Sequence, residues 1–182
     1  MTIVQKNTPV LHRVAEKVPL EKIQTSNIQN VIARMKEALA GETDGVAIAA
    51  PQIGKSLRIF VVSGKAFSIL ERGTKHEHKE TPVAEIPPDA VFINPVITKL
   101  SRKKTAIDEG CLSIRHWYGK VERHEKATVR AYDEQGKRFE RGGSGLLAQI
   151  FQHEVDHLDG ILFTDKARDL QEIHPNNNEP AA

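Results

Sequence analysis

Apolar residues recur at helical spacing in two stretches of the chain. Between residues 26 and 41 they stand at 28, 31, 32, 35 and 39, which predicts an amphipathic helix with Ser26 as N-cap and Gly41 at its end. After Ser144, which can cap a second helix, residues 146, 150, 153 and 157 form another stripe, and Gly160 can end it. This stripe begins apolar and finishes in histidine, so the buried face of the helix should end at a polar site.

Shorter apolar segments predict strands. The runs LRIFVV (57–62) and VFINPVI (91–97) are β-branched and apolar, and the second should be interrupted or at a sheet edge because of Pro95. The polar segment 64–90 between them contains three prolines and predicts a surface loop. Residues 119–140 alternate around the turn EQG and predict a meander of strands.

Composition narrows the class of protein. With 182 residues, 39% hydrophobic and 27% charged, the chain suits one globular domain, predicted to span residues 1–168. The end of the chain, NNNEPAA, has too little apolar content to fold, so residues 169–182 are predicted to be a disordered polar tail. A net charge of +2 is too weak to indicate nucleic-acid binding. No apolar run approaches the roughly 18 residues of a membrane span, and no secretory h-region is present, which predicts a cytoplasmic protein.

The segment QHEVDHLDG (152–160) carries the candidate chemistry. His153 and His157 are four residues apart, so both imidazoles project from one helix face at a spacing that one metal ion can bridge. An isolated H-E-x-x-H is about as often an ordinary solvated or core helix, and a tight site needs a further ligand. Cys111 in DEGCLSI can supply it, although a lone cysteine is more often a buried apolar side chain. A thiolate with two imidazoles leaves the fourth tetrahedral position for water, as in a catalytic site.

Three segments in this order resemble a known family. GVAIAAPQ (45–52), EGCLS (109–113) and QHEVDHLDG resemble the three motifs of the peptide deformylases, and the similarity extends over about residues 8–165. The resemblance implies hydrolysis of the N-formyl group from the formyl-methionine of newly made polypeptides, with release of formate. It also implies Fe(II) as the native metal, with zinc, nickel or cobalt able to occupy the site, whereas ligand preference alone would suit zinc. We therefore predict an α+β fold in which antiparallel β-sheets pack around a central helix that carries the H-E-x-x-H.

Three groups have predicted catalytic roles. Glu154 follows a ligand but is turned about 100° around the helix, so it can reach the water as a general base without binding the metal. Gln52 offers a side-chain N–H₂ to the oxyanion that forms on the formyl carbon. By resemblance, the second oxyanion donor is the backbone N–H of Leu112.

The substrate groove is also predicted by resemblance. An extended strand at residues 45–48 and the segment at Gly110 would clamp the peptide backbone as an added strand, while three residues of the metal-binding helix would line a methionine pocket. The predicted substrate-binding residues are Gly45, Val46, Ala47, Gly110, Leu146, Gln149 and Ile150.

The chain departs from the family pattern at the groove. Gln149 is polar where an apolar wall is usual, and SIRHWYG (113–119) lacks the usual proline. Ala47 stands where the first motif has its second glycine, so its methyl is expected to narrow the groove. Trp117 and Tyr118 are equally compatible with the core and with the groove wall.

Two pairs of charged or metal-binding residues have no predicted part in the chemistry. Glu109 and Arg123 resemble a structural ion pair of the family near the site, and we assign neither a chemical role. His76 and His78 form an H-x-H without a third ligand and are expected to be solvated.

Two alternative functions remain compatible with the sequence. A deformylase-like hydrolase of another small N-acyl group is favoured if the groove residues have changed its shape. An inactive homologue that binds metal or peptides is disfavoured, because Gln52 and Glu154 are dispensable for binding and both are present. The expected partners are formyl-methionyl nascent peptides and, transiently, the ribosome. We expect a monomer that binds neither nucleic acid nor a membrane.

Overall fold

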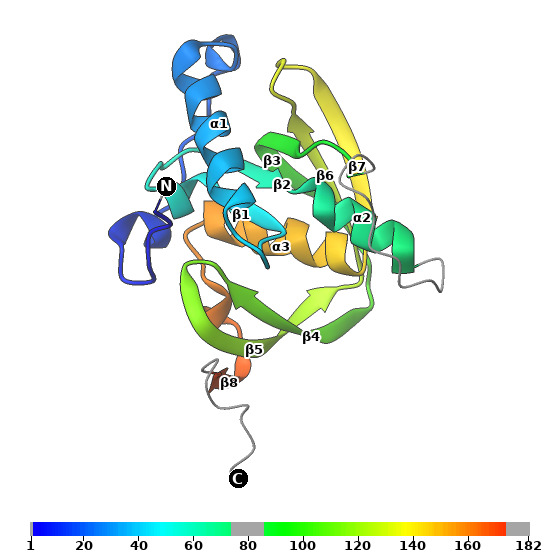
Figure 1. Ribbon diagram of the computed structural model, residues 1–182. Helices are drawn as coiled ribbons and strands as arrows, with labels where there is room; N and C mark the ends of the chain where they lie inside the picture. Colours follow the sequence, from blue (N-terminus) through cyan, green and yellow to red (C-terminus); the bar gives the residue numbers. More distant parts are fainter. Residues whose placement is uncertain (1, 74–85, 174–182) are drawn as a thin grey trace.

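The computed structural model describes residues 2–73 and 86–173 (Figure 1). The α-helices in these ranges are α1 (Ser26–Ala40), α2 (Gly64–Gly73) and α3 (Leu146–Leu158). The strands are β1 (Ala47–Ala49), β2 (Ile59–Val62), β3 (Ala90–Leu100), β4 (Lys104–Cys111), β5 (Ile114–His124), β6 (Lys126–Tyr132), β7 (Arg138–Ser144) and β8 (Arg168–Glu172).

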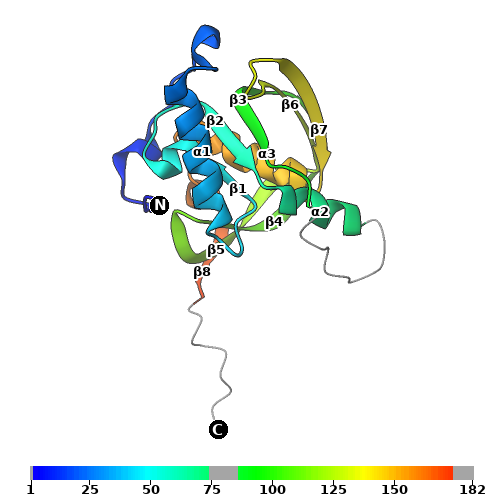
Figure 2. The same ribbon diagram turned by 45° about the horizontal axis from the view of Figure 1, so that its top comes forward.

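The larger sheet has five antiparallel strands in the order β1-β2-β3-β6-β7. Helix α1 lies across β1 and β2 on the outer face of this sheet (Figure 2). The predicted apolar stripe of α1 is buried against the sheet, because its spacing keeps these side chains on one face: Ile28, Val31, Ile32, Met35 and Leu39. The helix predicted for residues 26–41 is therefore confirmed.

Helix α3 lies between the larger sheet and a smaller antiparallel sheet of order β4-β5-β8 (Figure 1). On the side of the larger sheet, Phe151 packs against Phe92 at 5.3 Å between ring centroids, and Phe92 stacks on Phe60 at 4.5 Å. Each aromatic pair adds about 0.5–1.5 kcal/mol beyond the burial of its area. The predicted α+β fold, with antiparallel sheets around the helix that carries H-E-x-x-H, is confirmed.

Strand β3 is interrupted at Pro95, as predicted, but it lies in the middle of the sheet. Its register with β6 shifts between Ile93 and Val96, and Asn94 adopts a positive φ of 51°. The Asn94 amide accepts a hydrogen bond from the Val18 N–H at 2.9 Å and donates one to the Val18 carbonyl at 2.7 Å. The bulge and these bonds allow a residue without an N–H inside a central strand.

The surface loop predicted for residues 64–90 is wrong for its first part. Residues 64–73 form α2, which packs against α3 and buries Ala66 and Phe67. The Arg141 guanidinium lies 4.2 Å from the centroid of the Phe67 ring. The prolines at 82, 87 and 88 come after this helix, so they did not exclude it. His76 and His78 lie outside the described residues.

The meander predicted for residues 119–140 is confirmed for the β6–β7 hairpin, where Gly136 turns with φ of 79°. Strands β5 and β6 follow each other in sequence but belong to different sheets. Gln152 of α3 stabilises the crossing: its Oε1 accepts the His124 N–H at 3.0 Å, and its Nε2 donates to the His124 carbonyl at 2.9 Å.

The ends of three elements differ from prediction. The N-caps are Thr25 for α1 and Gly145 for α3, one residue away from the predicted Ser26 and Ser144. The disordered tail predicted from residue 169 is wrong for its first residues, because Arg168–Glu172 forms β8 and pairs with β5. Backbone pairing orders this segment although its side chains are exposed. Across residues 2–73 and 86–173, none of the helices has both the length and the apolar character needed to cross a membrane.

Candidate metal centre

The turn of the β4–β5 hairpin brings Cys111 against helix α3. Cys111 ends β4, and Leu112 and Ser113 form the turn before Ile114 pairs back with Cys111. Ligand atoms of Cys111, His153 and His157 all lie within 4.8 Å of one another, and the Cys111 Sγ lies 3.2 Å from the His157 Nε2. The structure therefore brings the three predicted ligands together.

A buried charged network orients one of the imidazoles. The His153 Nδ1–H donates to the Glu109 Oε2 at 3.0 Å, which leaves Nε2 as the nitrogen able to bind a metal. Glu109 in turn accepts two bonds from Arg123, at 2.7 and 3.0 Å, and Arg123 Nη1 donates to the Asp156 Oδ2 at 2.6 Å. Burial raises the pKa of the Glu109 carboxyl, but hydrogen bonds from His153 and Arg123 outweigh it and hold that pKa at about 2.

The surroundings of Cys111 lower the pKa of its thiol. Burial raises the pKa of this thiol, whereas the charge of His157 and hydrogen bonds from the two imidazoles lower it, with a net pKa of about 5. The Ser113 N–H also points at the sulfur, at 3.4 Å. A thiolate is the form that binds metals, so this environment favours ligation.

Gln52 is buried with a fixed amide orientation. It lies in a 3₁₀ turn (Ala50–Ile53), where its Oε1 accepts the Ala49 N–H at 2.8 Å. With the oxygen engaged, the Nε2 faces the Ser113 Oγ at 3.3 Å and the Cys111 Sγ at 3.5 Å. The only group that this side chain presents to the centre is therefore a donor.

Glu154 is buried beside the centre without a full set of partners. Its side chain is 4% exposed, and among the described residues no group donates to its Oε2. Burial raises the pKa of this carboxyl to about 7, against the opposing charges of His153 and His157. A carboxyl that titrates near neutrality can both take up and release a proton at physiological pH.

A cleft of about 830 Å³ opens from the centre. Glu154, Gln52 and the turn residue Leu112 line it together with Cys111 and His153. All seven predicted substrate-binding residues also lie along its wall: Gly45, Val46, Ala47, Gly110, Leu146, Gln149 and Ile150. The two glycines of this wall leave little room for a side chain. A Cβ at Gly110 would lie 2.8 Å from the Tyr118 Cε1, and one at Gly45 would lie 2.9 Å from the Glu42 Cβ.

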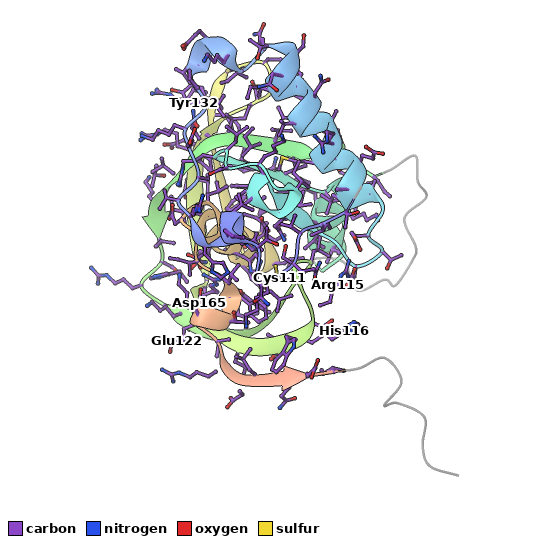
Figure 3. All side chains as sticks on the ribbon, turned by 90° about the vertical axis from the view of Figure 1, so that its left-hand side faces the viewer. Cys111, Arg115, His116, Glu122, Tyr132 and Asp165 are labelled. Carbon is purple, nitrogen blue, oxygen red and sulfur yellow. The ribbon has the colours of Figure 1, made fainter. Side chains whose placement is uncertain are left out.

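The outer end of the cleft is lined by residues that lie outside the three sequence motifs, and we call these residues the lip. The sequence did not distinguish between a core and a groove position for Trp117 and Tyr118. Both are partly exposed and line the cleft. Arg115 lines it too and forms an ion pair with Glu42 from the segment after α1. Figure 3 places Cys111 near the middle of the molecule and Arg115 and His116 nearer its edge. The remaining residues of the lip are Asp44, His116 and Ile173.

The donor set fits a single first-row divalent ion. One thiolate and two imidazole nitrogens suit zinc or iron(II) better than a hard cation such as magnesium or calcium. The bond from His153 to Glu109 is the outer partner that metal-binding histidines usually have.

The profile of the polypeptide deformylase family matches residues 1–172. The chain belongs to this family. Peptide deformylase 1A, chloroplastic/mitochondrial, of Arabidopsis thaliana is 40% identical over 171 residues, which cover 90% of this chain and 60% of the relative. The peptide deformylase of Roseiflexus castenholzii is 36% identical over 163 residues, covering 88% of this chain and 84% of the relative.

A solved structure of the family has the same fold. The Met-Ala-Ser-bound class I type b peptide deformylase from Acinetobacter baumannii superposes with a TM-score of 0.74 at 29% identity, over 91% of this chain and 98% of that chain. The Arabidopsis thaliana relative and peptide deformylase 1A, chloroplastic, of Solanum lycopersicum are longer proteins, of which this chain spans 60% and 58%.

Proposed function

We propose that the protein is a peptide deformylase, a metal-dependent amidohydrolase whose single catalytic domain removes the N-formyl group from formyl-methionyl peptides. The observation that carries the proposal is the triangle of Cys111, His153 and His157 at the base of a cleft, with Glu154 and Gln52 beside it. A plant relative and a bacterial relative are both named as peptide deformylases, which supports the proposal.

Cys111, His153 and His157 would hold the metal, which we propose to be Fe(II), with zinc, nickel or cobalt able to replace it. When bound, such an ion activates a water molecule and polarises the formyl carbonyl. The lowered pKa of the Cys111 thiol and the bond from His153 to Glu109 keep both side chains in the state required for binding.

The peptide would bind as an additional strand along β1. Strand β1 pairs only with β2 among the described strands, so its other edge, near Ala47, faces the cleft. Gly45 and Val46 continue this edge, and Gly110 lies on the opposite wall. Backbone pairing on both sides would hold the formyl group in register with the metal centre.

Glu154 would move the proton. Water adds to the formyl carbon as its proton passes to the Glu154 carboxylate, and the same proton is then given to the amine nitrogen as the C–N bond breaks. Formate and a free amino terminus result. The raised pKa of Glu154 suits both transfers.

Gln52 and Leu112 would stabilise the oxyanion. The Gln52 Nε2 is aimed at the centre because its Oε1 is held by Ala49, and the Leu112 N–H lies in the turn next to the cysteine ligand. Donors that are already oriented need no rearrangement in the transition state, and each contributes about 2.7–4 kcal/mol.

The methionine pocket would be formed by Leu146, Gln149 and Ile150. The polar residue here is not left unpaired, because the Gln149 Nε2 donates to the Asp108 carbonyl at 3.1 Å. Its amide is directed at β4, so the methylenes of the side chain remain to contact methionine.

Formate release tests the proposal. Protein purified without oxygen, with its metal content measured, should hydrolyse formyl-Met-Ala-Ser and leave acetyl-Met-Ala-Ser almost untouched. Preference for the acetyl peptide would instead support a hydrolase of another N-acyl group. Bound metal without turnover of either peptide would support an inactive binding protein.

The setting of the reaction is part of the same proposal. The named relatives include a chloroplastic/mitochondrial protein and bacterial ones. We propose that this protein acts as a monomer in the cytoplasm on nascent chains, in transient contact with the ribosome. Because residues 168–172 form a strand, any such contact would not use a helix there.

A further inference from the structure

Basic side chains are concentrated where the chain first passes from the larger sheet to the smaller one. Residues 99–104, KLSRKK, contain four cations in six positions and connect the end of β3 to the start of β4. Stretches this rich in lysine and arginine are typical of surfaces that bind nucleic acids. The net charge of the whole chain, only +2, did not indicate such a surface because it averages over the molecule.

Strand pairing adds two more cations to this region. The Lys126 carbonyl accepts the Ser101 N–H at 2.9 Å, so β6 begins beside the same turn. Lys99 is directly opposite Thr128 on β6, and Lys126 and Arg130 lie two residues to either side of Thr128. Alternate residues of a strand share a face about 7 Å apart, so Lys99, Lys126 and Arg130 project from one face of the larger sheet.

That face is open to solvent beside β6 and β7. Ala127 and Val129, which alternate with the cations along β6, are buried in the core on the side of α3. The cations therefore point away from α3. Helix α1 packs on β1 and β2 and does not extend over β6 and β7 (Figure 2).

Small residues of β7 form a flat floor between these cations. Thr128 pairs with Gly142, and Lys126 pairs with Ser144. Among the described residues, a Cβ at Gly142 would have only the Thr128 Oγ1 within 4 Å, at 3.8 Å. The backbone of a ligand can therefore come close to the sheet, where hydroxyl groups lie between the charges.

The acidic residues near these cations are few. Glu125 is held by Lys103 at 2.8 Å. Glu140 lies opposite Arg130, and Glu122 lies further along β5. Within the described part of the chain, five exposed cations of this region form no ion pair, and we name them the basic strip: Lys99, Arg102, Lys104, Lys126 and Arg130. Like charges held this close repel one another, and a bound polyanion would relieve the repulsion.

We propose that the basic strip docks the protein on the phosphate backbone of double-helical RNA. Lysine and arginine neutralise phosphates, and hydroxyl groups such as that of Thr128 add hydrogen bonds to the backbone. A flat sheet face suits the wide, shallow minor groove of an RNA helix, which displays the 2′-hydroxyls, better than the narrow minor groove of DNA. The strip contains no aromatic side chain on which an unpaired base could stack, so double-stranded RNA is the better partner and its sequence should matter little.

Docking on RNA would leave the cleft free. The residues that line the cleft do not include those of the strip, and the larger sheet lies between the strip and α3. The proposal therefore goes beyond the proposed function. RNA binding and formate release can be measured independently.

Titration of a labelled RNA duplex of about 20 base pairs, followed by fluorescence anisotropy, tests the proposal. With about four phosphate contacts, the affinity should fall by about 10²-fold between 50 and 200 mM salt. A DNA duplex of the same sequence should bind several-fold more weakly. Equal or tighter binding of the DNA duplex, or binding to phosphatidylserine vesicles in place of RNA, would overturn the proposal.

Removal of charge locates the contact on β6. Lys126→Gln combined with Arg130→Gln should weaken binding at least about 10-fold at 50 mM salt and reduce the slope of log affinity against log salt by about 2. Lys55→Gln combined with Arg34→Gln is the matched control, because it removes the same two charge types from exposed positions outside the strip. Equal weakening by both double variants, or by neither, would contradict a docking site on this face.

Formate release separates this proposal from the proposed function. The double variant of Lys126 and Arg130 should hydrolyse formyl-Met-Ala-Ser at the wild-type rate, because neither residue lines the cleft. Failure of the wild-type protein to release formate would reject the proposed function, while the RNA titration would still decide whether the strip binds.

Discussion

The β4–β5 hairpin contains two regions of opposite character. On β4, Glu109 is buried and bonded to both Arg123 and His153, so its position is fixed by several strong contacts. On β5, the bulge at residues 115–117 presents partly exposed side chains to the cleft. The carboxylate behind the metal centre is therefore held by several bonds, whereas the side chains of the lip are more open to solvent. The residues that orient a metal ligand and the residues that line the outer cleft therefore belong to different parts of one hairpin.

The largest effect should come from removing a ligand. Cys111→Ala or His157→Ala should weaken metal binding by more than the ~10–100-fold typical of outer partners, because only two protein ligands remain. Activity should disappear with the metal, and the melting temperature should fall because bound metal stabilises the folded state. Metal analysis after dialysis checks this, with the exposed His12→Ala as control. One tightly bound ion per chain in either variant would disprove the ligand assignment.

Glu154→Gln should separate turnover from metal retention. The variant preserves size and removes the carboxylate, so kcat should fall by about 10²–10⁴-fold, the range of general acid–base catalysis, while the metal stays bound. Formate release and metal content from the same sample give the answer. Turnover near the parent rate would mean that another group moves the proton.

Gln52→Glu should remove the oxyanion donor while keeping the local fold. The new carboxylate can still accept the Ala49 N–H, but it presents an oxygen to the centre, so kcat should fall by at least about 10²–10³-fold. Gln52→Leu also leaves that buried N–H unpaired, which costs a further ~1–3 kcal/mol of stability. If Gln52→Glu remains active, the Nε2 is not a donor to the transition state.

The sequence predicted the metal centre well because short-range spacing determines much of it. Two imidazoles four residues apart on one helix must share a face, and the motif around Cys111 named the third ligand. The network behind them was harder to predict. Asp156 contacts Arg123 only because β5 packs against α3, which brings together residues 33 positions apart in the sequence.

The lip could not be predicted because it depends on strand register. Nothing in the sequence RHW (115–117) indicates that these three residues are extra on β5. The pairing of β8 depends on backbone bonds from residues whose side chains are exposed. Helix α2 was missed for a related reason. Among the residues of this helix whose burial is described, the buried apolar side chains are Ala66 and Phe67, which give too short an apolar pattern to distinguish a helix from a loop.

Arg123→Met should weaken the bonds that hold Glu109 without touching a ligand. Removing one partner of a buried ion pair leaves Glu109 with the His153 N–H but without its guanidinium, so unfolding should be easier by up to about 3–5 kcal/mol. Metal affinity should fall by ~10–100-fold, since Glu109 orients His153. Lys166→Met, which removes only the partly exposed pair with Asp156 at 2.7 Å, is the control and should cost about 1 kcal/mol or less.

The same variant should alter acid stability. The folded pKa of Glu109, about 2, lies below its ordinary value of 4.5, so its stabilisation is present above about pH 4.5 and is lost as the pH falls through 2. In Arg123→Met this pKa should rise, which moves the acid-unfolding midpoint to higher pH. Denaturation of both proteins between pH 2 and 7 gives the comparison, and an unchanged midpoint would argue that Arg123 does not hold the carboxylate ionised.

The smallest effect should come from Ala47→Gly, at the border between the two regions. The sequence suggested that this methyl narrows the groove, but in the fold Ala47 is only 8% exposed and packs in the cluster with Phe60, Val62 and Ile150, so little of it reaches the cleft. Its loss should therefore lower stability by about 0.5–1 kcal/mol, with kcat/KM for formyl-Met-Ala-Ser within about 2-fold of the parent. Ala49→Gly is the matched control, because Ala49 belongs to the same strand and cluster but does not line the cleft. Thermal melts and steady-state kinetics of the three proteins distinguish the two interpretations. A gain of about 3- to 10-fold in kcat/KM for Ala47→Gly alone, with an unchanged melting temperature, would mean that the methyl does hold the peptide out of line.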